Sequence, residues 1–416
     1  MKDKQAKYPQ LRFKGFTDPW EERKLSDVAN HRGGTAIEKY FDKDGVYKVI
    51  SIGSYGLNSQ YVDQNIRAIS NEITDGKVVN SGELTMVLND KTANGTIIGR
   101  TLLVEKDNEY VINQRTEIIS PKENFDSNFA YTILNGPFRE KVKRIVQGGT
   151  QIYVNYPAVS NLNLELPKIE EQQKIGSFFK QLDDTIALHQ RKLAKLKELK
   201  QGYLQKLFPK NGSKFPQLRF AGFADDWEER KLSDVANHRG GTAIEKYFDK
   251  DGVYKVISIG SYGLNSQYVD QNIRAISNDI TDGRVVNSGE LTMVLNDKTA
   301  NGTIIGRSLL VEQDNEYVIN QRTEIISPKE TFDSNFAYTI LNGPFRKKVK
   351  RIVQGGTQIY VNYPAVSNLY LELPKIEEQQ KIGLFFKQLD NTIALHQRKL
   401  EKLQELKKGY LQKMFC

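Results

Sequence analysis

Residues that hold metals and disulfides are scarce in this sequence of 416 residues. Its one cysteine is Cys416, so a disulfide framework, a cysteine-based zinc site and a cysteine nucleophile inside the fold are excluded. Its four histidines are too few and too scattered for a His-rich metal site: they are His31, His189, His238 and His396. We therefore expect no metal site in this chain.

Long apolar runs are missing as well. No segment approaches the roughly 18 residues that a membrane helix needs. The opening MKDKQAKYPQ lacks the apolar core of a secretory signal. These absences predict a cytoplasmic protein that does not associate with membranes.

Catalytic motifs are equally scarce. The sequence has no GxxxxGK(S/T) or GxGxxG phosphate-binding loop and no Asn-Pro-Pro-aromatic motif of amino-methyltransferases. Asp18, Glu22 and Lys24 have the letters of a nuclease site, but their spacing is very short and most such matches are accidental. We expect no catalytic residue and no cofactor in this chain.

The dominant feature that is present is an internal repeat. Residues 8–208 match residues 215–415 at a constant offset of 207, with 17 differences over 201 positions. Residues 209–214 form a short polar linker between the copies. The net charge is +9, but residues 1–7 and the linker carry +2 each, and the tail of each copy carries most of the rest. Total charge is therefore weak support for nucleic-acid binding, and local clusters decide that question.

Each copy divides into a mixed part, residues 8–166 or 215–373, and a tail, residues 167–208 or 374–415. The mixed part is rich in β-branched and aromatic residues broken by Gly, Asn and Asp, which is typical of strands bounded by turns. We therefore predict a mixed α/β (α+β) fold for it.

Particular segments of the first copy carry this prediction. Three segments are expected to form strands, namely Val46–Ile52, Leu84–Leu88, and Thr96–Gly99 running into Leu102–Val104. Phe129–Val146 is expected to form a helix that is interrupted at Gly136-Pro137.

Each tail has the pattern of one long helix. Pro167 suits a helix start, and apolar residues recur at spacings of 4 and 3, a 3.5-residue period that predicts a coiled-coil seam. Leu188, Leu199 and Leu204 are expected to widen this seam, and His189 and His396 lie on it, where a polar residue can fix helix register. The seam residues are Ile175, Phe179, Leu182, Ile186, Leu193 and Leu196, and in the second tail Ile382, Phe386, Leu389, Ile393, Leu400 and Leu403.

Two long seamed helices in one chain bury their apolar faces most simply by pairing with each other. Forty residues at 1.5 Å per residue would make a rod of about 60 Å. An antiparallel coiled coil would relate the two globular parts by a pseudo-twofold axis and hold these near-identical parts a fixed distance apart.

Polar loops with basic residues are the candidates for DNA contact. Gln147–Asn155 follows the basic residues Arg139, Lys141, Lys143 and Arg144. Asn89–Gly95 precedes Arg100, Asn113–Arg115 is a third polar loop, and Arg32 stands in a glycine loop after His31. Asn, Gln and Arg can pair with base edges, and basic residues can position phosphates. Solvated helix faces and flexible loops remain alternative interpretations of these segments.

The candidate DNA-binding residues follow from these loops. In the first copy they are Arg32, Lys91, Thr92, Arg100, Arg115, Arg144, Gln151 and Tyr153. Their counterparts in the second copy are Arg239, Lys298, Thr299, Arg307, Arg322, Arg351, Gln358 and Tyr360.

The tail closely resembles the spacer helix of type I restriction-modification specificity subunits (HsdS). The matching residues are Pro167, Glu171-Gln172, Ile175 and Leu207-Phe208, which recur as Pro374, Glu378-Gln379, Ile382 and Met414-Phe415. The opening of each copy, with Pro9–Phe13, Trp20-Glu21 and Lys24-Leu25 in the first, also looks like the start of a target-recognition domain of that family. The resemblance covers nearly the whole chain.

The resemblance implies a function that the residues alone do not specify. Such subunits have two target-recognition domains that each read half of a bipartite site in double-stranded DNA, and antiparallel spacer helices that dock modification subunits (HsdM). Restriction subunits (HsdR) join that complex. S-adenosylmethionine, ATP and Mg²⁺ are then expected on the partner subunits, which catalyse methylation and ATP-dependent cleavage, while this chain is not itself an enzyme.

In one respect the sequence departs from the family pattern, because its two recognition domains are almost identical instead of dissimilar. Trp20–Asn71, Val78–Arg100 and Lys141–Leu162 are unchanged in the second copy. We therefore predict an interrupted palindrome as the target. Three alternatives remain open: a coiled-coil adaptor that binds protein without reading DNA, a stand-alone restriction enzyme, and a specificity subunit that serves methylation alone.

Overall fold

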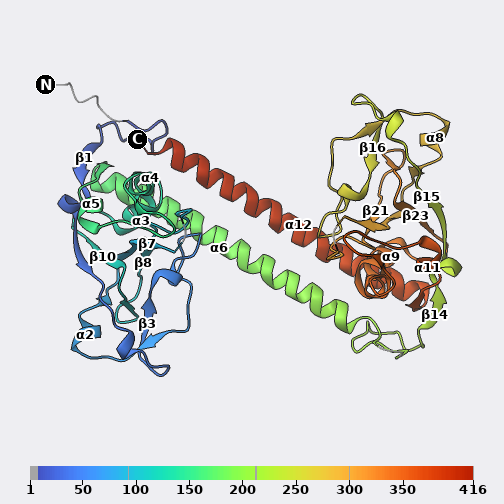
Figure 1. Ribbon diagram of the computed structural model, residues 1–416, viewed down its shortest axis with the longest axis horizontal. Helices are drawn as coiled ribbons and strands as arrows, with labels where there is room; N and C mark the ends of the chain where they lie inside the picture. The colour runs from blue at the N-terminus through green and yellow to red at the C-terminus, as the bar shows by residue number, and fades with distance from the viewer. Residues whose placement is uncertain (1–7, 92, 211–212, 299, 416) are drawn as a thin grey trace. The chain divides into compact units, whose positions relative to one another are not determined.

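Two compact units make up the chain, and each takes residues from both copies of the repeat. The computed structural model describes residues 8–91, 93–210, 213–298 and 300–415 (Figure 1). The first unit consists of Met1–Gln190 and Arg398–Cys416, and the second of Arg191–Gln397. We call the globular part of each copy, residues 8–166 or 215–373, its recognition domain, after the family that the sequence resembles. The end of each long helix belongs to the unit that contains the recognition domain of the other copy.

The first recognition domain is built from short strands and short helices. Four sheets have the strand orders β2-β10-β6-β8, β4-β3-β9-β5, β11-β12-β7 and β1-β13. All pairings are antiparallel except that of β3 with β9. The elements are β1 (Glu21–Lys24), α1 (Leu25–Val28), β2 (Ala29–Gly33), β3 (Tyr47–Ile50), β4 (Arg67–Ala68), α2 (Glu72–Asp75), β5 (Val78–Val79), β6 (Leu84–Val87), β7 (Asn89–Asp90), β8 (Thr101–Leu103), β9 (Tyr110–Ile112), β10 (Thr116–Pro121), α3 (Ser127–Asn135), α4 (Pro137–Lys143), β11 (Gln147–Gly148), β12 (Ile152–Tyr153), α5 (Tyr156–Ser160) and β13 (Asn163–Leu166).

The second recognition domain repeats these elements 207 residues later, except that a π-helical segment, Leu341–Phe345, joins α9 to α10 where Gly136 separates α3 from α4, and this confirms the mixed fold predicted for both copies. Its pairings have the same order, for example β15-β23-β19-β21 and β20-β25-β24. The elements are β14 (Glu228–Lys231), α7 (Leu232–Val235), β15 (Ala236–Gly240), β16 (Tyr254–Ile257), β17 (Arg274–Ala275), α8 (Asp279–Asp282), β18 (Val285–Val286), β19 (Leu291–Val294), β20 (Asn296–Asp297), β21 (Ser308–Leu310), β22 (Tyr317–Ile319), β23 (Thr323–Pro328), α9 (Ser334–Ile340), α10 (Arg346–Val349), β24 (Gln354–Gly355), β25 (Ile359–Tyr360), α11 (Tyr363–Ser367) and β26 (Tyr370–Leu373).

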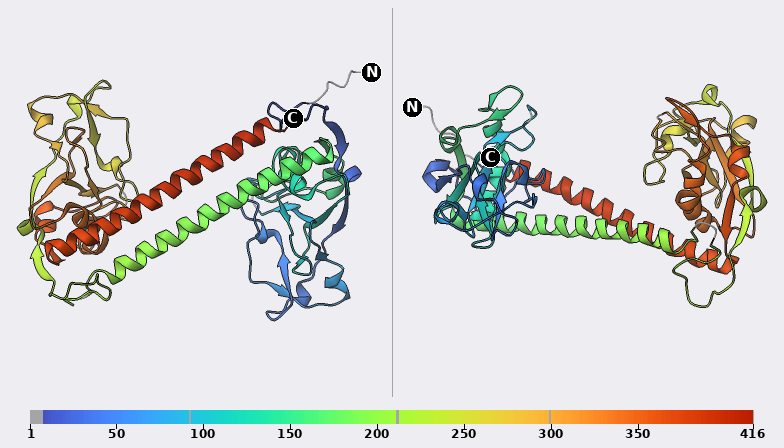
Figure 2. Two further views of the ribbon diagram at one scale, coloured as in Figure 1. Left: turned by 180° about the vertical axis from the view of Figure 1, so that it is seen from behind. Right: turned by 60° about the horizontal axis from the view of Figure 1, so that its bottom comes forward.

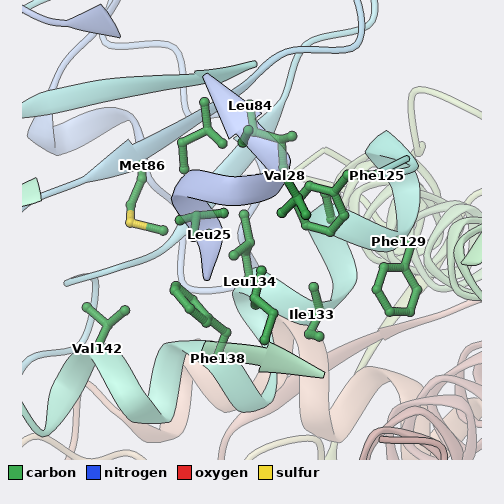
Figure 3. Packing of buried hydrophobic residues seen from close by; sticks show 14 of the residues in the cluster. Leu25, Val28, Leu84, Met86, Phe125, Phe129, Ile133, Leu134, Phe138 and Val142 are labelled. Carbon is green, nitrogen blue, oxygen red and sulfur yellow. The ribbon is translucent and has the colours of Figure 1, made fainter. Parts of the chain in front are cut away.

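Strand β6 lies at the centre of the packing. Its residues are buried on both faces, as expected for a strand of continuous apolar character. Leu84 and Met86 face a core that they share with Phe138 of α4 (Figure 3), while Val87 belongs to a second core on the other face. The break at Gly136 that separates α3 from α4 confirms the interrupted helix predicted from the sequence.

Two local predictions for the first copy were wrong. Thr96–Gly99 does not form a strand but a turn, in which the amide of Ile97 donates to the Asp90 carboxylate (2.8 Å) and Gly99 has φ of +70°. The segment from His31 is not a flexible loop, because Ala29–Gly33 pairs with β10 as an edge strand. The turn has a partner seven residues away, whereas strand Ala29–Gly33 depends on a partner that is distant in the sequence.

The tails form the long helices α6 (Ile169–Lys206) and α12 (Ile376–Lys413), as predicted. Figures 1 and 2 show each of them as one unbroken helix. No helix in the described ranges is long and apolar enough to cross a membrane.

The Glu-Gln pair at the start of each long helix holds it to the preceding recognition domain. Glu171 is 1% exposed and accepts both Nε–H and Nη2–H of Arg12, each at 2.7 Å. The amide of Gln172 accepts from the backbone of Asp126 (3.1 Å) and donates to the carbonyl of Pro167 (2.9 Å). Arg219 makes the same pair with Glu378 in the second unit.

The apolar seams are buried where the helices meet inside each unit. In the first unit Phe178 packs on Tyr410, with ring centroids 5.1 Å apart, and Asp183 accepts from Lys407 at 2.5 Å. From the first contact to the second, the residue number increases along α6 and decreases along α12, so the two helices run antiparallel there. All twelve predicted seam residues are buried or half-buried. The expected widening by Leu188 and Leu199 was wrong, because both are exposed on another face of α6.

The residues that follow each long helix complete a core. Phe415 is 7% exposed and packs against Trp20, Phe129 and Phe179, with ring centroids 6.0, 5.7 and 5.9 Å away. In the second unit Phe208 occupies the equivalent place beside Trp227. Each core therefore contains a residue contributed by the tail of the other copy.

Candidate nucleic-acid interface

Three polar loops that lie far apart in the sequence of the first copy meet in the structure. Loop Asn89–Gly95 and loop Gln147–Asn155 are joined through the sheet β11-β12-β7, in which Asn89 pairs with Tyr153. The amide of Val154 donates to the carbonyl of Leu88, and the amide of Leu88 donates to the carbonyl of Arg115, each at 2.9 Å. The third loop, Asn113–Arg115, is thereby held beside the other two.

A groove of about 700 Å³ opens beside two of these loops, where Arg115 lies close to Tyr153 and Asn155, and Leu88 is the nearest lining residue to loop Asn89–Gly95. Glycine is required at its edge, because a Cβ on Gly34 would lie 2.0 Å from the carbonyl oxygen of Asn113. The lining includes a guanidinium, a carboxylate, an amide and two phenol rings, from Arg115, Glu117, Asn155, Tyr153 and Tyr156. These are the side-chain types that contact base edges and phosphates in DNA.

Several predicted residues are exposed in or beside this groove. Arg115 is exposed and has a left-handed backbone, with φ of +66°, which is uncommon for a residue other than glycine. Tyr153 is 38% exposed. Lys91, Arg144 and Gln151 are exposed on the same polar loops or just before them. Thr92 and its counterpart Thr299 lie outside the described residues.

The second unit repeats the arrangement. β20 pairs with β25, and the amides of Leu295 and Val361 make the same 2.9 Å bonds that tie the loops together in the first unit. The exposed candidates on these loops are Lys298, Arg322, Arg351, Gln358 and Tyr360.

Arg32 and Arg100 do not line the groove. Nη2 of Arg32 donates to both carboxylate oxygens of Glu83, at 2.8 and 2.7 Å. Arg100 is half-buried and donates to the carbonyl of Thr96 and to the hydroxyl of Ser59, each at 2.9 Å, and burial lowers its pKa. Their counterparts Arg239 and Arg307 have the same partners. The structure gives all four of them partners within the protein.

The basic cluster before Gln147 divides into different roles. Arg139, expected on the surface, is 7% exposed, and its guanidinium donates to the carbonyls of Gly95, Thr96 and Ile98 at 2.8–3.0 Å. Burial lowers its pKa to about 10. It holds the turn after loop Asn89–Gly95. Lys141 pairs with Glu165 at 3.0 Å.

A pair that the sequence did not predict lies at the edge of the groove. Nδ1 of His31 and Oε1 of Glu117 are 2.6 Å apart, and the His31 ring lies on Tyr156 with centroids 4.6 Å apart. Burial raises the pKa of Glu117, against the opposing effect of the bond to His31. Glu117 is the one charged residue in β10, where it lies among buried neighbours. A charge in such a strand is the one feature of the sequence that points to a special environment for Glu117, but it does not identify His31 as the partner.

The residues considered as a nuclease site have other partners. Asp18 pairs with Lys168 at 2.7 Å, and Lys24 donates to the Asn161 side chain at 3.1 Å. Within the described ranges no group of three or more His, Cys, Asp or Glu side chains is placed to hold a metal ion.

Comparison with known protein families gives two matches in this chain. A family model described as the type I restriction modification DNA specificity domain matches residues 17–198 and again residues 224–405. Each match contains one recognition domain and most of the helix that follows it.

Individual proteins and structures are similar over almost the whole length. The MjaVIII type I restriction enzyme specificity subunit of Methanocaldococcus jannaschii is 23% identical over 97% of this chain and 94% of its own. The putative MjaX specificity subunit of the same organism is 21% identical over 97% of this chain and 95% of its own. The crystal structure of the type I restriction-modification system S subunit from M. genitalium has a TM-score of 0.68, at 13% identity, over 98% of this chain and 99% of its own, and so has the same fold.

Proposed function

Because this chain belongs to the type I restriction-modification DNA specificity family, we propose that its two recognition domains read the same DNA half-site twice. The chain is a specificity subunit of a type I restriction-modification system. The proposed reading surface is the groove beside Arg115 and Tyr153 in the first domain and the equivalent surface beside Arg322 and Tyr360 in the second.

The observation that carries this proposal is that the polar loop segments of the two copies are identical in sequence. None of the 17 differences between the copies falls within Asn89–Gly95, Asn113–Arg115 or Gln147–Asn155. Identical side chains on an identical backbone present the same donors and acceptors to DNA, so they select the same bases.

Two identical readers favour a palindromic target. The antiparallel contacts of α6 with α12 recur in each unit, with Asp183 and Lys407 in the first and Asp390 and Lys200 in the second. Each unit therefore contains the same helix contacts, and two readers with the same base preference that are related symmetrically recognise palindromes. We propose an interrupted palindrome, with its gap set by the helices.

Catalysis is proposed to lie on other chains. Modification subunits would dock on the long helices and transfer methyl groups from S-adenosylmethionine. Restriction subunits, where the system has them, would supply cleavage driven by ATP and Mg²⁺. A complex that methylates without cleaving would use this chain in the same way. DNA reading of this kind would take place in the cytoplasm.

Methylome sequencing of cells that express the chain with its modification subunits tests the proposal. We expect one bipartite motif whose half-sites are inverted repeats of each other. The matched control is a double variant, Arg115→Ala with Arg322→Ala, which should change both half-sites together. An asymmetric motif with two unlike half-sites would refute the shared reading.

A further inference from the structure

The histidine at the edge of each groove is held in one orientation by two neighbours. His31 lies on edge strand β2, with Nδ1 2.6 Å from the Glu117 carboxylate and its ring on Tyr156. In the second unit His238 has the same partners, Glu324 at 2.7 Å and Tyr363 with ring centroids 4.6 Å apart. The imidazole is thus fixed in plane and position although 53% of it remains exposed.

The partner of Nδ1 determines what the other ring nitrogen can do. When the Glu117 carboxylate is ionised it only accepts hydrogen bonds, and Nδ1 of His31 then carries the proton of this bond. Nε2 of the neutral ring is then an acceptor. In the major groove the base edges that donate are the exocyclic amino groups of adenine and cytosine.

Stability alone does not account for this pair. Glu117 is 8% exposed, and burial of its carboxylate raises its pKa, which means that the fold disfavours the charged form. The hydrogen bond that the carboxylate accepts comes from an imidazole that is itself 53% exposed. Glu117 and Tyr156, the two residues that hold the His31 ring, line the groove together with Arg115 and Tyr153. A buried carboxylate that orients an exposed imidazole at such a groove is typical of a functional site.

We propose that His31 and His238 are base-reading residues, each accepting a hydrogen bond at Nε2 from the amino group of an adenine or cytosine. Glu117 and Glu324 are positioning residues that fix the imidazole tautomer. This inference rests on the proposed function, since it assigns one base of each half-site to a particular side chain.

Methylation of a pool of randomised duplexes by the complex with its modification subunits tests the assignment. His31→Ala should weaken the preference for one amino-bearing base in a single half-site by roughly tenfold, the effect of one lost hydrogen bond to a base edge. His238→Ala should do so in one half-site as well, and the double variant in both. Asn30→Ala is the matched control, because neighbouring strand residues point to opposite faces.

Variants of Glu117 and Glu324 test the positioning role. Gln keeps an oxygen that can accept from Nδ1, so Glu117→Gln with Glu324→Gln should retain most of the preference. Glu117→Leu with Glu324→Leu removes the acceptor and should lose it. A purely structural role would shift the melting temperature of the leucine variant and leave the base preference of the folded complex unchanged.

The outcomes separate this inference from the proposed function. If the unchanged complex methylates a defined bipartite motif and the double histidine variant methylates the same motif with the same preference, only the histidine assignment is overturned. Equal weakening at every base position would overturn it too, because it would indicate a phosphate contact. If the unchanged complex has no sequence preference, the proposed function fails and the inference with it.

Discussion

The packing of Phe415 predicts that a substitution near the end of α12 destabilises the first unit and spares the second. Phe415 is 7% exposed, and its ring contacts Trp20, Phe129 and Phe179. Replacing a buried Phe by Ala removes transfer free energy and leaves a cavity, at a cost of about 3–5 kcal/mol. We expect Phe415→Ala to lower the free energy of unfolding of the first unit by that amount.

The chain offers its own reporters for this experiment. It has two tryptophans, Trp20 in the first unit and Trp227 in the second. Trp227→Phe leaves Trp20 as the only indole, and Trp20→Phe leaves Trp227. Urea unfolding followed by fluorescence then reports each unit separately. With an m-value of roughly 2–3 kcal/mol/M, the Trp20 transition should move down by about 1–2 M in Phe415→Ala.

The equivalent substitution in the other copy is the matched control. Phe208→Ala should lower the Trp227 transition and leave that of Trp20 in place, because Phe208 packs beside Trp227. The reasoning is refuted if Phe415→Ala leaves the Trp20 midpoint unchanged. It is also refuted if that substitution lowers the Trp227 midpoint by the same amount.

Three further predictions follow from single contacts. Glu171→Ala leaves the Arg12 guanidinium without its bidentate partner at 2.7 Å and should cost about 3–5 kcal/mol in urea unfolding; an unchanged midpoint contradicts this. Arg115→Ala should reduce discrimination at one base pair of one half-site by about 1–3 kcal/mol in competition gel shifts, and a uniform loss over all sequences would contradict direct reading. The Arg67 guanidinium lowers the pKa of Asp63 to about 2 from 3.8. The stabilisation by the charged Asp63 is present above pH 3.8 and is lost as pH falls toward 2. In Asp63→Asn the melting temperature should therefore fall less steeply over that pH range than in the unchanged protein.

The helices and the polar loops could be predicted because their patterns are local. A 3.5-residue period depends only on neighbouring turns, and it placed Ile175 and Phe179 correctly in a buried seam. The polar segments Gln147–Asn155, which contains β11 and β12, and Asn89–Gly95, which begins with β7, were recognised by composition alone. Their meeting depends on strand pairing between Asn89 and Tyr153, which no local pattern contains.

The errors arise where a residue's partner is distant. From the sequence Arg139 was expected to be a surface charge. In the structure its guanidinium donates to the carbonyls of Gly95, Thr96 and Ile98, which lie more than 40 residues earlier and are not paired in a strand. His31 and Glu117 are 86 residues apart and meet only because β2 and β10 are neighbours. A single sequence contains no sign of such encounters.

The division of the chain into units has a consequence for its synthesis. The second unit is one continuous stretch, Arg191–Gln397, whereas the first needs residues from Arg398 onward. On the ribosome the first recognition domain emerges early, yet the Phe415 that covers Trp20 and Phe129 arrives only after the whole second unit has been made. We expect the second unit to reach its final packing first, and the nascent first domain to present an uncovered apolar surface to chaperones during the delay. Crosslinking of stalled nascent chains would show this order of completion.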